Sequence, residues 1–183
     1  MSAENTNKKH ELLLYAYSLL CDVTPKKYDC GMLCGSACCK ENTAHGTDGE
    51  SGMLLLPGEK ELLCGTKDFK FVKSDEGELL VCDGSCVREL RPFACRMFPF
   101  YPHIETCGGR YIIKIKPDPR ASVICPVFSD FRKRKTHAEF LRNAKKAVRT
   151  LLADDDIAKE LCSQSDMISD IEKLRGMLLN GLR

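Results

Sequence analysis

The chain lacks an apolar run long enough to cross a membrane. A spanning helix needs about 20 apolar residues, and the longest candidate, Leu12–Leu20, is far shorter. This run also makes a poor secretory signal, because Glu11 stands at its front and no small-residue cleavage site follows it. We therefore expect a cytoplasmic protein without a membrane segment, whose thiols are reduced or bound to metal.

The sequence also lacks the usual marks of several functional classes. The formal net charge is only +2, which points to no class of partner. No paired catalytic carboxylates and no His–Glu motif are evident, so whether the chain is an enzyme stays open. A zinc finger of the two-Cys-two-His type is absent as well.

Cysteine is what the chain has in abundance, with twelve in 183 residues. Most of them gather in two stretches, at residues 30–39 and 82–95, and a further one follows the second stretch. Spacings of two to four residues let one loop deliver two ligands to one metal ion. The predicted metal ligands are Cys30, Cys34, Cys38, Cys39, Cys82, Cys86, Cys95 and Cys125.

Thiolate sulfur is a soft donor that suits zinc, iron and iron–sulfur clusters. The first stretch is rich in glycine, which lets the backbone curl around an ion. Cys38 and Cys39 are adjacent, and neighbouring side chains diverge along a backbone. Such a pair more easily serves two ions, or two irons of one cluster, than a single ion. Cys21 and Cys162 fall on apolar helical faces and are better explained by packing.

The segment RPFACRMFP over residues 91–99 places one cysteine between two arginines. Pro92 fits the first position of a short helix, which places Cys95 in the first turn, where the helix dipole favours a thiolate. Arg91 and Arg96 are placed to offset the negative charge of a thiolate site and to donate hydrogen bonds to sulfur. A nucleophilic role for Cys95 is the less favoured alternative, because no obvious base accompanies it.

These cysteines and the RPxxCRxFP element together resemble the YkgJ-type cysteine-cluster family over about residues 28–126. The resemblance implies a domain that chelates zinc or iron. In this chain both gaps of the first cysteine element are three residues, whereas the family often has two before the cysteine pair. A similar cluster occurs in flagellin lysine N-methylase-like proteins, which keeps an enzymatic alternative open.

The order of elements predicts an α+β fold. Apolar periodicity indicates a helix over 10–21, and β-branched or alternating residues indicate strands over 69–73, 79–82 and 111–116. A capping-box pattern at Thr136 opens a second, helical part. We predict a small, irregular cysteine-cluster domain over residues 1–128 and a C-terminal helical segment over 129–183 that forms a hairpin.

Charge divides the C-terminal segment into a basic part, residues 132–149, and an acidic part, residues 154–172. We favour a helical hairpin in which these opposite charges face each other. The alternative is a nucleic-acid-binding zinc module that uses the basic helix, and the neighbouring acidic stretch disfavours it. A protein partner at the helical tail is left open. The leading prediction is a metal-binding protein that holds zinc or iron, with an iron–sulfur centre in a redox or accessory role as one form of it.

Overall fold

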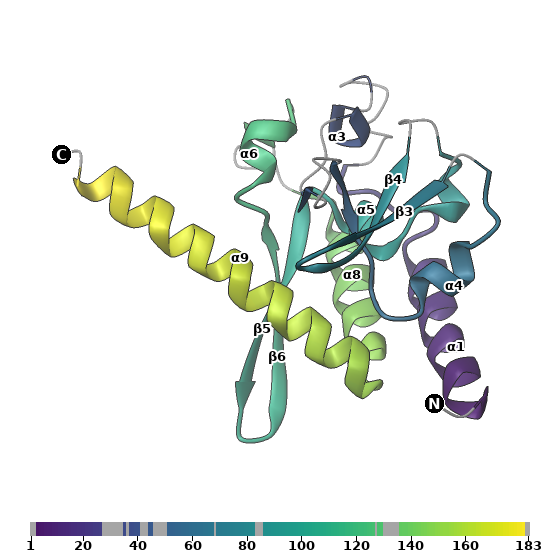
Figure 1. Ribbon diagram of the computed structural model, residues 1–183. Coiled ribbons are helices and arrows are strands. Elements are labelled where there is room, and N and C mark those ends of the chain that lie inside the picture. The colour runs from purple at the N-terminus through teal and green to yellow at the C-terminus, as the bar shows by residue number, and fades with distance from the viewer. Residues whose placement is uncertain are drawn as a thin grey trace.

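The structure is a computed structural model that describes residues 3–26, 35, 37–40, 44–45, 51–67, 69–82, 86–126, 128–129 and 136–181 (Figure 1). Its helices are α1 (Ala3–Leu19), α3 (Ala37–Lys40), α4 (Glu59–Leu63), η1 (Arg88–Leu90), α5 (Phe93–Met97), α6 (Ala121–Ile124), α8 (Ala138–Leu151) and α9 (Asp155–Gly181). Its strands are β1 (Ala44–His45), β2 (Ser51–Leu54), β3 (Phe69–Ser74), β4 (Gly77–Cys82), β5 (Phe100–Cys107) and β6 (Arg110–Pro117). The predicted α+β class is confirmed.

The strands form two small antiparallel sheets. One has the order β1-β2-β4-β3, and the other is the hairpin β5–β6. The predicted strands at 69–73, 79–82 and 111–116 correspond to β3, β4 and β6. Strand β5 was not predicted, because two prolines flank or interrupt its first residues. Gly108 and Gly109 make its turn to β6 with positive φ angles of 56° and 71°, which glycine adopts without strain.

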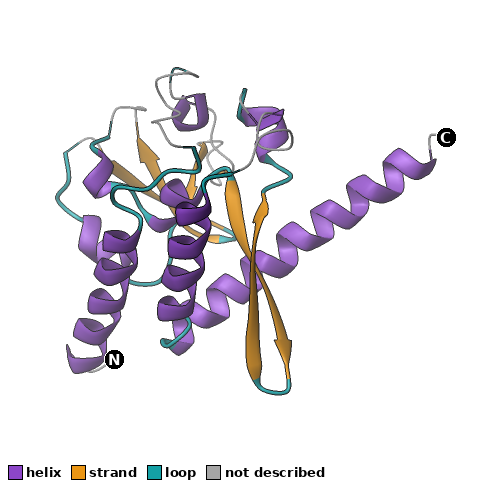
Figure 2. Cartoon of the chain, turned by 180° about the vertical axis from the view of Figure 1, so that it is seen from behind, coloured by secondary structure: helices purple, strands orange, loops and turns teal. Residues whose placement is uncertain are grey.

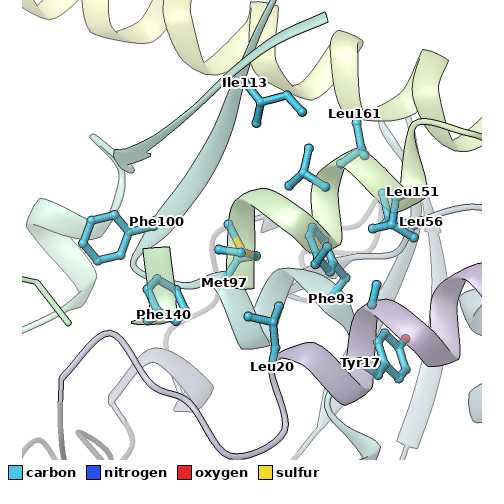
Figure 3. Packing of buried hydrophobic residues seen from close by; sticks show 14 of the residues in the cluster. Tyr17, Leu20, Leu56, Phe93, Met97, Phe100, Ile113, Phe140, Leu151 and Leu161 are labelled. Carbon is cyan, nitrogen blue, oxygen red and sulfur yellow. The ribbon is translucent and has the colours of Figure 1, made fainter. Parts of the chain in front are cut away.

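One hydrophobic core joins the helices to the hairpin. It includes Leu13 of α1, Leu20 just after that helix, Met97 of α5, Ile113 of β6 and Phe140 of α8. Figure 3 labels the last four of these. Side chains from both sides of the predicted boundary between residues 128 and 129 therefore pack into the same main core. Apolar burial of this kind is the largest favourable term in folding.

The two C-terminal helices take separate courses, which differs from the expected hairpin with facing charges. Helix α8 lies beside α1 and contacts β6, whereas α9 crosses β5 and runs outward (Figures 1 and 2). The acidic side chains of α9 pair outside α8: Asp156 contacts Lys9 of α1 at 2.5 Å, and Glu172 contacts Lys116 of β6 at 3.8 Å. Hydrophobic packing on α1 and β5 decides the directions of these helices.

Within the described ranges, no helix is both long and apolar enough to cross a membrane.

Candidate metal centre

Four of the predicted ligands line a single cavity. Cys38 comes from α3, Cys82 ends β4, Cys86 follows four residues later, and Cys95 lies in α5. The cavity holds about 40 Å³, which is room for a few water-sized groups. Its other lining side chains are Met53, Leu80, Arg91, Pro92 and Phe98. The fold thus brings the second cysteine stretch against the end of the first.

The thiol of Cys86 forms hydrogen bonds with Cys82 and Arg91, which also line this cavity. Its pKa is lowered to about 6, chiefly by a hydrogen bond with Cys82 and further by a hydrogen bond and the positive charge of Arg91. Arg91 therefore sits where the sequence predicted a cation that stabilises sulfur anions. A thiol with so low a pKa is largely ionised at neutral pH, and the thiolate is the form that binds metal.

A buried carboxylate fixes the helix that carries Cys95. Glu59 is fully buried, and its Oε1 accepts a hydrogen bond of 2.6 Å from the backbone N–H of Phe93, the first residue of α5. Its Oε2 accepts one of 2.7 Å from the N–H of Leu56, and the Tyr17 hydroxyl donates to Oε1. Burial raises the pKa of Glu59, and these three hydrogen bonds oppose that rise. Glu59 thus ties α1, the segment before α4 and α5 together beside the cavity.

Arg96 acts on the backbone near the cavity. Its Nε donates to the carbonyl of Arg91 at 2.7 Å, and its Nη2 donates to the carbonyl of Glu89 at 2.8 Å. The guanidinium also lies over the Tyr17 ring, 4.3 Å from the ring centroid. The sequence predicted that Arg91 and Arg96 would both compensate thiolate charge. In the structure Arg91 lines the cavity, whereas Arg96 holds the segment that carries Arg91.

Of the remaining predicted ligands, Cys125 is the one whose side chain the structure describes. Cys30 and Cys34 are outside the described residues, and so is the side chain of Cys39, although its backbone belongs to α3. Cys125 is buried at the end of α6 and packs in the main hydrophobic core. Within the described part of the chain, no three His, Cys, Asp or Glu side chains meet closely enough to hold a metal ion as they stand.

The cysteines assigned to packing fit that assignment in part. Cys162 packs against the main core, and burial raises its pKa. Cys21 is partly buried. Cys64 and Cys107, which are not among the predicted ligands, are exposed. The His103 ring, which does not line this cavity, faces Ser169 and Glu105. Sequence reasoning missed Glu59 and Tyr17, because a lone glutamate in a helix-forming segment looks like any solvent-exposed residue.

The basic segment is described only in its helical part. Arg142, Lys145, Lys146 and Arg149 are exposed on α8. Lys146 lies over the ring of Tyr15 in α1, with its Nζ 5.4 Å from the ring centroid. Residues 132–135 of the predicted basic stretch fall outside the described residues.

Comparisons with family models, curated proteins and solved structures found no match to this chain.

Proposed function

We propose that this chain binds zinc or iron through thiolates at the cavity between α3, β4 and α5. The observation that carries the proposal is the convergence of Cys38, Cys82, Cys86 and Cys95, which come from separate parts of the sequence, on one small space. Packing alone gives no reason for cysteines from separate segments to gather beside an arginine. Thiolate ligation explains this arrangement, because four thiolates on a divalent ion leave a net negative charge that Arg91 offsets.

The cavity favours an ion or a small cluster over an organic substrate. A volume of about 40 Å³ leaves space for only a few small groups. The apolar side chains of Met53, Leu80 and Phe98 line the cavity, and apolar surroundings strengthen the attraction between thiolates and a cation. The adjacent Cys39, together with Cys30 and Cys34, offers further sulfur for a centre with more than one ion.

The resemblance to the YkgJ-type family supports the same chemistry through the RPxxCRxFP element. In this chain Arg91 and Cys95 of that element both line the cavity. Its Pro92 stands at the N-terminus of α5 and Arg96 anchors the backbone, so each of these residues has a part in forming the site. A zinc centre here would be structural, whereas an iron–sulfur centre would support electron transfer or a partner enzyme.

The proposal is tested by metal analysis of protein purified without oxygen. We expect zinc or iron in the wild type, and acid-labile sulfide with visible absorption if the centre is an iron–sulfur cluster. Cys86→Ser and Cys95→Ser each remove a ligand and should weaken metal binding at least tenfold, the loss typical even of outer partners. Cys64→Ser and Cys107→Ser change exposed cysteines that do not line the cavity, and both should keep the metal.

A folded wild type without metal would refute the proposal, and so would equal metal content in Cys86→Ser and Cys107→Ser. Cys125→Ala separates the two roles open to that residue. If Cys125 is a ligand, this variant loses metal. If it only fills the core, the variant keeps metal and unfolds at a lower denaturant concentration.

A further inference from the structure

Helix α9 has one face that binds the body of the protein. The Ser165 hydroxyl is buried and accepts a hydrogen bond of 2.9 Å from the N–H of Ile104 in β5. One turn later, Ser169 lies 3.1 Å from Nδ1 of His103, and the next turn brings Glu172 to Lys116. These contacts follow one side of the helix along the hairpin β5–β6.

The opposite side of α9 carries an apolar stripe, which we define as Ile171, Leu174, Met177 and Leu178. Leu174 follows Ser165 by nine positions, and at about 100° per residue it points away from the hairpin. The exposed fractions of Leu174, Met177 and Leu178 are 60%, 68% and 69%. This half of α9 extends away from the two sheets (Figures 1 and 2). Large apolar side chains grouped in this way indicate an interaction surface.

The spacing of the stripe matches one heptad of a coiled coil. Ile171, Leu174 and Leu178 follow each other at three and four residues, which places them at positions a, d and a of a heptad. Met177 then occupies a g position, where its long side chain covers the edge of such a seam. A helix of the same pattern is the natural complement, because each apolar knob fits between four residues of the facing helix.

Charges beside the stripe favour a second copy of this chain in the parallel direction. Asp170 stands at a g position and Arg175 at the e position five residues later, and these two positions meet across a parallel dimer. Asp170 accepts a hydrogen bond of 2.9 Å from Lys173 of its own helix, and its carboxylate can accept from a second donor as well. Arg175 uses Nη1 to contact the Pro119 carbonyl and the Ser122 hydroxyl. A guanidinium has five N–H donors, so the same side chain can also bind a carboxylate of a second copy.

A lipid surface is a poorer occupant for this stripe. Helices that lie on membranes carry Lys and Arg on their polar face. The part of α9 that carries the stripe instead balances Asp170 and Glu172 against Lys173 and Arg175, so it offers no net positive charge to the anionic lipids of a membrane.

We propose that two copies of this chain associate through the C-terminal halves of their α9 helices, as a short parallel coiled coil centred on Leu174. The mass of the wild type, measured by sedimentation equilibrium over a range of concentrations, should approach that of a dimer. Leu174→Glu with Leu178→Glu should raise the dimer dissociation constant at least a hundredfold, because four buried leucines are lost per dimer. A matched control, Leu14→Glu with Ile112→Glu, alters exposed apolar residues outside the stripe and should leave the dimer intact.

The parallel direction is tested by charge reversal. Asp170→Arg leaves a cation at both position 170 and position 175, and Arg175→Asp leaves an anion at both. Like charges then face each other across the dimer, so each variant alone should dimerise at least tenfold more weakly. Mixing the two variants pairs opposite charges at both edges and should restore dimers. Circular dichroism confirms that each variant is folded. A monomeric wild type at all concentrations, a dimer that survives the double glutamate variant, or binding of monomers to phosphatidylglycerol vesicles would each overturn the proposal.

Discussion

At the scale of single residues, Glu59 shows how much of the site depends on one buried side chain. It is a charged residue type in the interior, and it stays there because donors from three segments meet it: the Tyr17 hydroxyl and the backbone N–H groups of Leu56 and Phe93. A buried polar group without such partners would be strongly destabilising. Arg96 lies beside this network and extends it to the segment that carries Arg91.

Glu59→Gln should therefore lower the free energy of unfolding by about 1–3 kcal/mol, the cost of a buried donor left without an acceptor. Glutamine keeps the size of the side chain, but its NH₂ group cannot accept from the N–H of Leu56 or Phe93. Urea unfolding measures the difference. Glu61→Gln is the control, because Glu61 lies in the same helix and is exposed. Equal stability of the two variants would contradict this role for Glu59.

At the scale of elements, a polar cluster fastens α9 to the hairpin β5–β6. His103 of β5 lies between Ser169 of α9 and Glu105, at 3.1 Å and 2.9 Å from its two ring nitrogens. Lys114 of β6 donates to both oxygens of Glu105, at 3.2 Å and 3.1 Å. The hydrogen bond with His103 is the largest cause that lowers the pKa of Glu105, followed by that with Lys114.

A lowered pKa means that folding favours the ionised Glu105. Its contribution to stability is present above the ordinary pKa of a glutamate and is lost as the pH falls through the lowered value of the folded state. We therefore expect Glu105→Gln to melt below the wild type near neutral pH, and this gap in melting temperature to close in acid. Glu11→Gln, at an exposed position of α1, is the control. A gap that does not change with pH would contradict the assignment.

At the scale of the whole molecule, one core links the cysteine-rich part to the helical segment. Phe140 of α8 is fully buried, and its ring lies 5.7 Å from that of Phe100 in β5. Leu161 of α9 and Leu13 of α1 belong to the same cluster. Because neighbouring parts that share a core stabilise each other, we expect residues 1–128 and 129–183 to unfold together.

Phe140→Ala tests this coupling. The five tyrosines all precede residue 129 and the chain has no tryptophan, so tyrosine fluorescence reports on the N-terminal part, whereas circular dichroism at 222 nm responds strongly to α8 and α9. The variant should lose about 3–5 kcal/mol of unfolding free energy and shift both signals equally. Leu14→Ala, at an exposed position, should shift neither. A shift confined to the circular dichroism signal would show that the two parts unfold separately.

Local sequence by itself determined the α+β class, most of the helices and the strands β3, β4 and β6. These depend on apolar periodicity and turn residues, which act between near neighbours in the chain. The predicted capping box at Thr136 was wrong, because α8 begins at Ala138 and has His137 as its N-cap, without a side-chain hydrogen bond. Cysteine spacing also determined which residues are candidates for a metal centre, since ligand chemistry is a property of the side chain itself.

Only the tertiary structure decided which candidates meet. It places Cys38, Cys82, Cys86 and Cys95 at one cavity and Cys125 in the main core. In the tertiary structure Glu59 is also buried, and α9 packs across β5 and leaves its apolar stripe exposed. Each of these outcomes depends on contacts between residues far apart in the sequence. Such contacts form where the folded chain packs closely and buries the surfaces of both residues.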